Sequence, residues 1–258
     1  MRRDLALLLR QVRYENKAFW RNPAAAFFTF AFPLIFLVIF NLLFGNDEVG
    51  IYGRTTRGST FYVPAIAAFS VITACYTNVA IGVCLARDQG LLKRVRGTPL
   101  PGWAYLAGRV IHATLIALGL AAIVTVAGVA FYGVDPPGNT LPALVVSIAV
   151  GAGAFCALGL AVTALIPNAD ASPAVVNASI LPLLFVSDVF IPLRDAPAWL
   201  KTFADLFPVR HFAQAMLGAF NPFEKGSGFE TADLLVVALW GTAGTLVAVR
   251  FFSWEPRR

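Results

Sequence analysis

Six long apolar runs dominate this sequence and limit its fold more than any other feature. Each has roughly 20 mostly apolar residues, the length that a helix needs to cross the hydrocarbon core of a bilayer. Strands of a membrane barrel would instead alternate apolar and polar residues over about ten positions. The sequence therefore predicts an all-α integral membrane protein with six transmembrane helices, at residues 24–44, 61–85, 104–131, 141–166, 173–191 and 234–252.

The composition agrees with a single membrane domain covering residues 1–258. Hydrophobic residues make up 58% of the chain and charged residues only 13%, whereas soluble domains are roughly half apolar and about a quarter charged. The formal net charge of +6 suits attraction to anionic membrane lipid. No aromatic-basic motif of a nucleic-acid-binding protein is present. The three cysteines and two histidines lie at no ligand spacing, so no metal site is predicted.

Lysine and arginine are distributed unevenly among the segments that connect the predicted spans. Fourteen lie before the first span, in or near the loop after the second, and towards the C-terminus, whereas six lie in the other connections. Cytoplasmic segments carry the excess of these residues, so both termini are predicted to be cytoplasmic. Arginine outnumbers lysine and alanine is abundant, which suggests a multi-pass protein of the bacterial cytoplasmic (inner) membrane.

Residues 1–22 have the two-sided pattern of a helix that lies in the cytoplasmic headgroup region. Apolar residues recur at helical spacing and basic residues fall on the opposite face, namely Leu5, Leu8, Leu9, Val12, Phe19 and Trp20 against Arg10, Arg13, Lys17 and Arg21. The alternative to an interfacial helix is a cluster of charges that only sets the orientation of the protein in the membrane. Asn22-Pro23 is predicted to end this interfacial helix, because a residue before proline disfavours helical geometry.

Residues 192–231 form the longest stretch outside the predicted spans, and they are unlike a solvated loop. Apolar residues such as Phe203, Phe207 and Phe212 are frequent, yet prolines interrupt the stretch too often for two crossings. We predict a re-entrant pair of short helices on the extracellular side, between spans five and six.

Residues 86–102 form a compact basic loop on the predicted cytoplasmic side. Leu91, Leu92 and Val95 can form the apolar edge of a short helix, which Thr98-Pro99 would end because proline cannot continue it. A rigid short helix of this kind suits the docking of a partner protein. The alternative is a positively charged loop that binds lipid phosphates.

The sequence contains no motif for nucleotide binding or catalysis. Gly45 and Gly50 have the spacing of a phosphate-binding loop, but Ile51 stands in place of its lysine. A self-sufficient secondary transporter would need ion ligands near the middle of the membrane, and a lipid-modifying membrane enzyme would need clustered acids or histidines. Neither pattern is evident, and both classes are kept as alternatives.

Taken as a whole, the chain resembles the permease subunits of type-2 ATP-binding-cassette exporters. The stretch "ARDQGLLKRVRGTPLP" resembles their second cytoplasmic loop, "FWRNP" the junction between interfacial helix and first span, and "LPLLFVSDVFIPLRDAPAWLKTFADLFPVRHFAQAML" the fifth span with its re-entrant pair. The loop departs from the family pattern at Ala86, where a glutamate is usual, and at Asp88, where aspartate replaces glutamate. Asp188 stands where the family has glycine or another small residue.

The resemblance implies a permease subunit that is not itself an enzyme and carries no cofactor. Two permeases, identical or paralogous, would pair, and each would bind a cytoplasmic nucleotide-binding ATPase subunit that holds ATP and Mg. The loop would be the coupling helix to that subunit, through Arg87, Asp88, Gly90, Leu91, Leu92, Lys93, Arg94, Val95, Arg96, Thr98 and Pro99. The connecting helix beside it would contribute Lys17, Trp20, Arg21, Asn22 and Pro23.

On this interpretation, the apolar edge of the coupling helix enters a groove on the ATPase subunit. Its two leucines are expected to dominate the affinity, since burying both is worth roughly 3–6 kcal/mol. Arg87, Lys93 and Arg94 are expected to pair with acids around the groove and to set orientation.

An aromatic-rich pathway with little charge suits export of hydrophobic or amphiphilic cargo, such as drugs, natural products, lipids or lipid-linked glycans. The candidate residues of this pathway are Phe69, Tyr76, Asn78, Asn177, Phe185 and Asp188. Asp188 has two interpretations, a structural acid bonded to nearby backbone or a polar contact at the outer exit.

Overall fold

The computed structural model describes residues 2–51, 54–193, 196–221, 223 and 226–255. Arg194, Lys225, Arg257 and Arg258, which contribute to the predicted charge asymmetry, lie outside the described residues, as do parts of the predicted re-entrant segment. Within the described ranges, five helices are long and apolar enough to cross a membrane: α2 (Pro23–Phe44), the continuous stretch Gly58–Asp88, α6 (Gly102–Tyr132), α7 (Leu141–Val162) and α11 (Thr231–Phe251).

These five helices match the predicted first, second, third, fourth and sixth spans to within a few residues. The largest difference is at the fourth, which ends at Val162 rather than at residue 166. The second span is divided into α3 (Gly58–Ile72), a π-helical turn η1 (Thr73–Thr77) and α4 (Asn78–Asp88). Short π-helical segments within α-helices often lie at functional sites.

The predicted fifth span is shorter than expected. Helix α8 (Ser172–Phe185) has 14 residues, which gives it a length of about 21 Å, short of the roughly 30 Å of a hydrocarbon core. Regular helix cannot continue through Asp188, because its φ of 58° is left-handed. A six-span topology therefore requires the turns at 186–191 to complete the crossing, and it stays a prediction.

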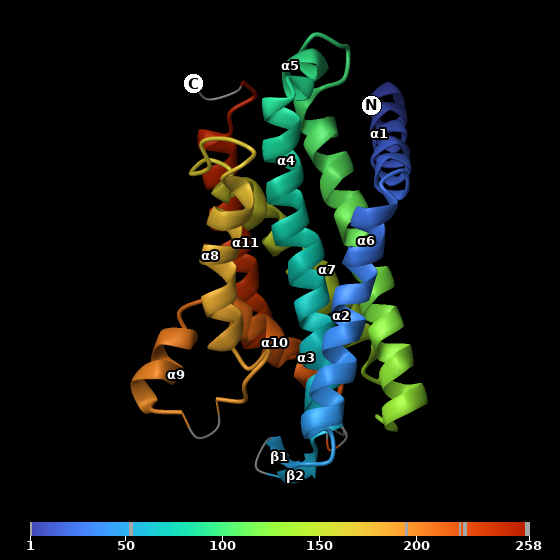
Figure 1. Cartoon of the computed structure of the whole chain (residues 1–258), viewed down its shortest axis with the longest axis vertical. Coiled ribbons are helices and arrows are strands. Elements are labelled where there is room, and N and C mark those ends of the chain that lie inside the picture. The colour runs from blue at the N-terminus through green and yellow to red at the C-terminus, as the bar shows by residue number, and fades with distance from the viewer. Residues whose placement is uncertain (1, 52–53, 194–195, 222, 224–225, 256–258) are drawn as a thin grey trace.

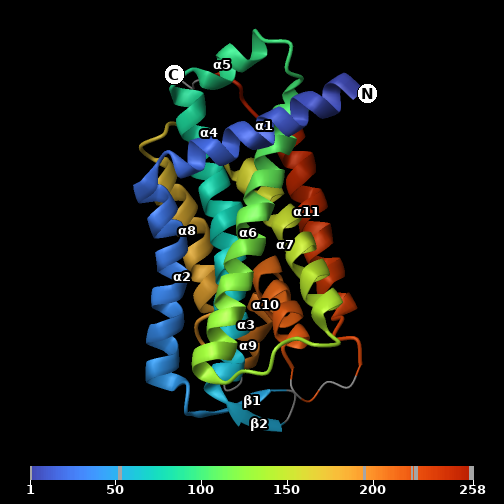
Figure 2. The same cartoon turned by 90° about the vertical axis from the view of Figure 1, so that its right-hand side faces the viewer.

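The elements gather at two ends of an elongated bundle (Figures 1 and 2). Helix α1 (Arg2–Trp20), helix α5 (Leu91–Arg96) and the end of α11 lie at one end, which we call the α5 end. The opposite end, the hairpin end, holds α9 (Ala198–Ala204) and the antiparallel strands β1 (Glu48–Ile51) and β2 (Arg54–Arg57). The hairpin was not predicted from the sequence.

Two short helices occupy the predicted re-entrant segment. Helix α9 exposes Trp199 and Phe203, whereas α10 (Pro208–Ala219) is mostly buried against α3, α7 and α11. Both are far too short to cross a membrane. Whether they dip into the outer leaflet remains a prediction.

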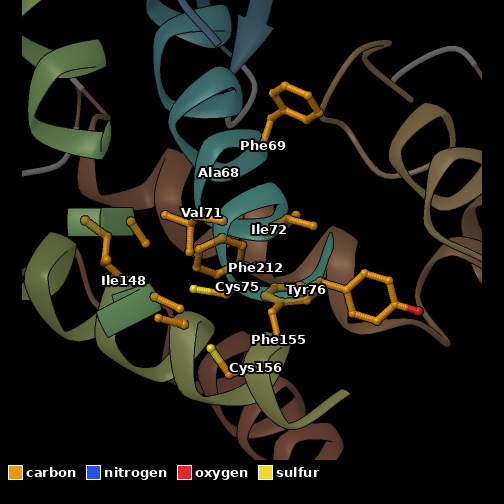
Figure 3. Packing of buried hydrophobic residues seen from close by; sticks show 14 of the residues in the cluster. Ala68, Phe69, Val71, Ile72, Cys75, Tyr76, Ile148, Phe155, Cys156 and Phe212 are labelled. Atoms are coloured by element: carbon orange, nitrogen blue, oxygen red, sulfur yellow. The ribbon is translucent and has the colours of Figure 1, made fainter. Parts of the chain in front are cut away.

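The core forms where α3 and η1 meet α7 and α10 (Figure 3). Phe155 of α7 and Phe212 of α10 pack edge to face, with ring centroids 5.4 Å apart. Gly151 makes this contact possible, because a Cβ at that position would stand 2.2 Å from the Phe212 ring. Close helix packing through small residues is typical of membrane proteins. Fourteen of the 15 residues of α3 are buried, so α3 is the central helix of the bundle.

Candidate functional site

Helix α5 forms a short cap on the α5 end of the bundle. Gly90 turns the chain from α4 into α5 with a φ of 69°, a conformation that glycine adopts without a Cβ penalty. After Arg96 the helix stops, and the Thr98 hydroxyl donates to the Val95 carbonyl at 2.7 Å. The structure thus confirms the predicted short helix and its end before Pro99.

Leu92, which was predicted to enter a partner's groove with Leu91 and Val95, faces into the protein instead, and docking through the other two residues stays a prediction. Leu92 is fully buried, while Leu91 and Val95 pack partly buried against the core. Burying apolar side chains against another apolar surface is favourable, and here that surface belongs to the same chain. The exposed residues of α5 and the turn after it are Lys93, Arg94, Arg96, Gly97, Thr98 and Pro99.

Arg87 also points inward, which contradicts its predicted pairing with acids of a partner. Its side chain is 1% exposed and donates to the carbonyls of Thr163, Ile166 and Pro167 at 3.2, 2.8 and 3.3 Å. Those carbonyls follow the C-terminus of α7, where the helix dipole favours a positive charge. Arg87 therefore ties the end of α4 to the connection between α7 and α8.

Asp88 extends the same junction. Its Oδ2 accepts a hydrogen bond from the Ala169 amide at 2.5 Å, and its Oδ1 faces the Arg87 Nε at 3.6 Å. The resemblance assigned Arg87 and Asp88 to the contact with an ATPase subunit. The structure instead uses the pair to join α4, and with it α5, to the α7–α8 connection.

Lys17, Arg21 and Asn22 are exposed at the corner between α1 and α2. Asn22 accepts a hydrogen bond from the Ala25 amide at 3.2 Å, so it caps α2 as well as ending α1. The predicted break at Asn22-Pro23 is confirmed. Trp20 stacks on Phe30 with centroids 5.7 Å apart, which ties the end of α1 to α2.

A buried polar contact that the sequence analysis missed fixes α1 on α6. Glu15 is 8% exposed and accepts from the Gln11 side-chain amide at 2.8 Å and from the Arg109 Nε at 3.4 Å. At Gly108 a Cβ would stand 2.6 Å from the Gln11 Cγ, so the two helices approach closely. The one available signal was Glu15 itself, an acid on a helix otherwise rich in basic residues.

Two of the cavities formed by the described residues lie between helices of the bundle. The larger, about 510 Å³, lies between η1, α7, α8, α10 and α11 and is almost entirely apolar. Its polar feature is the Tyr76 hydroxyl, 2.7 Å from the Ser179 hydroxyl of α8. The smaller, about 390 Å³, lies between α1, α2, α4 and α6 and is more polar.

The predicted pathway residues do not converge on one cavity. Tyr76 lines the larger cavity and Asn78 the smaller. Phe69 is buried against Phe36 and Phe190, and the exposed Phe185 also packs on Phe190, with centroids 5.2 Å apart. Asn177 is exposed on α8.

Asp188 is committed to contacts within the chain. Its Oδ1 accepts from the Leu193 amide at 2.6 Å, and its Oδ2 accepts from the Arg210 Nε and the Gln214 side-chain amide, each at 3.0 Å. It is 8% exposed. This geometry favours the structural interpretation of Asp188. Its positive φ also suits a position where the family has glycine, since aspartate tolerates left-handed geometry better than most residues.

Comparison with known proteins decides the family. The model of the ABC-2 type transporter family matches residues 7–221, which include every element from α2 to α10. This chain belongs to the ABC-2 type transporter family. It is a permease component of such a transporter, a membrane part that is not itself catalytic.

Several relatives of this ABC-2 chain are named for drug resistance. The daunorubicin resistance ABC transporter permease protein DrrB1 of Streptomyces coeruleorubidus is 30% identical over 71% of this chain and 64% of its own length. The probable doxorubicin resistance ABC transporter permease protein DrrC of Mycobacterium tuberculosis is 28% identical over 83% and 75%. The probable multidrug ABC transporter permease YbhR of Escherichia coli is 24% identical over 59% of this chain but only 41% of its own length.

Proposed function

We propose that this ABC-2 permease exports hydrophobic or amphiphilic compounds from the cytoplasm or inner leaflet, driven by a separate nucleotide-binding ATPase subunit. It would work as a dimer of permeases in the bacterial inner membrane, with six spans per copy. The α5 end, where α1 begins and α11 ends, would face the cytoplasm. Family membership and the drug-resistance names of relatives support this proposal.

The observation that carries the proposal is the attachment of α5 to the bundle. Leu92 fixes α5 by its buried side, and Arg87 with Asp88 joins the preceding end of α4 to the α7–α8 connection. A force applied to the exposed side of α5 would therefore move α4 and α7–α8 together and would not be absorbed by a loose loop. Such an arrangement suits a helix that transmits motion of an ATPase to the spans.

The exposed side of α5 determines how a partner would be recognised. Lys93, Arg94 and Arg96 are its exposed side chains, so we expect acidic residues on the ATPase subunit to face them. Exposed ion pairs contribute about 0–1 kcal/mol each, and charge reversal adds repulsion. We therefore propose that these charges, and not the leucines, provide the recognition.

The apolar cavity supports the proposed cargo class. A volume of about 510 Å³ falls within the roughly 300–1,000 Å³ typical of sites for drug-sized ligands. Tyr76 and Ser179 would offer such a molecule one hydrogen-bonding position in an otherwise apolar wall.

Copurification tests the proposal. The full chain should copurify with the nucleotide-binding subunit encoded next to its gene, and daunorubicin should stimulate ATP hydrolysis by the complex. Lys93→Glu combined with Arg94→Glu should release the ATPase subunit, whereas Arg54→Glu, an exposed charge at the hairpin end, should not. Retention of the subunit by the double variant would refute the docking role of α5. Weaker binding of that variant to anionic vesicles, with the subunit still attached, would instead favour the lipid-binding alternative.

A further inference from the structure

The smaller cavity, between α1, α2, α4 and α6, has a polar wall that the proposed function does not use. Glu15, Arg109 and His112 are the ionisable residues of this wall, and uncharged polar residues also line the cavity, namely Asn22, Thr29, Asn78 and Gln89. The rest of the lining is apolar or glycine, including Leu85 and Ile116. Its volume of about 390 Å³ can hold a headgroup and the upper part of an acyl chain.

Two nitrogen atoms of this wall are buried without a hydrogen-bond partner among the described residues. Arg109 uses its Nε for Glu15, but its Nη1 has no partner. His112 is 9% exposed, and its Nε2 also has none. Buried polar groups are nearly always hydrogen-bonded, so two such nitrogens in one cavity wall point to a bound group that accepts hydrogen bonds.

The charges of the wall indicate what kind of group would bind. Arg109 carries a positive charge that attracts an anion, and a phosphate oxygen is its usual strong acceptor. Glu15, in the same wall, would repel an anion that lacked a positive charge of its own. A zwitterion matches both residues, with its phosphate towards Arg109 and His112 and its ammonium towards Glu15.

The position of the cavity indicates where the group would come from. Its lining includes Ala25 and Thr29, in the first two turns of α2, directly after the corner with α1. An amphipathic helix such as α1 lies at the depth of lipid headgroups, and Figure 2 shows α1 crossing the end of the bundle at this level. The apolar part of the wall would then face the acyl chains of the same leaflet.

We propose that this cavity binds a zwitterionic membrane phospholipid with a primary ammonium headgroup, of the phosphatidylethanolamine class. Arg109 Nη1 and His112 Nε2 donate to the phosphate, and Glu15 accepts from the ammonium. The proposal is independent of the cargo and of the ATPase partner, because a lipid held here would fix α1 against α2, α4 and α6 whether or not transport occurs.

Gly82 provides a way to block the site without changing its charges. A Cβ at Gly82 would lie 3.8 Å from the Arg109 Nη1, at ordinary contact distance, so a larger side chain there would extend into the space beside the guanidinium. Gly119 on α6 is the matched control, because nothing lies within 4 Å of a Cβ at that position and it does not line the cavity.

Native mass spectrometry of the delipidated full chain, titrated with phosphatidylethanolamine, phosphatidylglycerol or inorganic phosphate, tests the proposal. We expect phosphatidylethanolamine to bind most tightly. Gly82→Leu and His112→Phe should each lower its affinity at least tenfold, and Gly119→Leu should leave it unchanged.

Three results would overturn this assignment. Equal affinity for phosphatidylglycerol would remove the role of Glu15, and equal binding of inorganic phosphate would indicate an anion site in place of a lipid site. Wild-type affinity in both Gly82→Leu and His112→Phe would place the lipid elsewhere. The unfolding temperature of each variant is measured alongside to detect misfolding. Gly82→Leu blocks the space and His112→Phe removes a donor, so if one variant misfolds, the lipid affinity of the other still decides the question.

Discussion

Replacing Arg87 by methionine is expected to destabilise the protein although the residue lies next to an exposed, charged loop. The guanidinium is 1% exposed and supplies the donors for three backbone carbonyls at 2.8–3.3 Å. Methionine keeps an unbranched stem of similar length but leaves the Ile166 and Pro167 carbonyls without this donor and Asp88 without its positive neighbour. The Thr163 carbonyl would keep only the Ile166 amide, at 3.4 Å.

The size of the effect follows from these contacts. An unpartnered buried polar group costs about 1–3 kcal/mol, and removing one member of a buried ion pair costs about 3–5 kcal/mol. These two costs cannot be added, because both arise from the loss of the same guanidinium. We therefore expect the free energy of unfolding to fall by about 3–5 kcal/mol. For a chain of this size that corresponds to a fall in unfolding temperature on the order of 10 °C.

A thiol-reactive fluorophore can follow this unfolding in detergent. Cys75, Cys84 and Cys156 are buried and form no disulfide, so their thiols should react only as the protein unfolds. Lys93→Met is the control, because it removes a basic residue from the same loop at an exposed position and should change stability by less than about 0.5 kcal/mol. Equal unfolding temperatures for Arg87→Met and Lys93→Met would refute the structural role of Arg87.

Three further substitutions test other parts of the structure. Gly151→Leu should prevent normal folding through its clash with the Phe212 ring, whereas Gly153→Leu, where nothing lies within 4 Å of a Cβ, should accumulate normally in membranes; equal accumulation would contradict the packing. Asp188→Gly should be more stable than Asp188→Ala by roughly 1–2 kcal/mol, since both lose the carboxylate but only glycine adopts a φ of 58° without cost; the reverse order in thermal unfolding would argue against the left-handed backbone. A cysteine at Arg94 should react only with reagent supplied from the cytoplasm, and labelling from outside would overturn the proposed orientation.

Local features of the sequence were sufficient to predict five long helices, the break at Asn22-Pro23 and the end of α5 before Thr98-Pro99. Each depends on the residues of one segment, because apolar length, proline geometry and helix capping act over a few neighbouring positions. The family could likewise be inferred from segments that follow one another along the chain.

The directions in which side chains point could not be inferred in this way. Leu92 and Arg87 were expected to face a partner, yet both are buried. Arg87 donates to carbonyls at the end of α7 and in the connection that follows it, some 76–80 residues further along the chain. Similarly, Glu15 pairs with Arg109 across 94 positions. The sequence by itself determined which segments are helical and apolar enough to enter a membrane. Only the tertiary structure decided which charges are exposed, because burial depends on neighbours that come from distant parts of the chain.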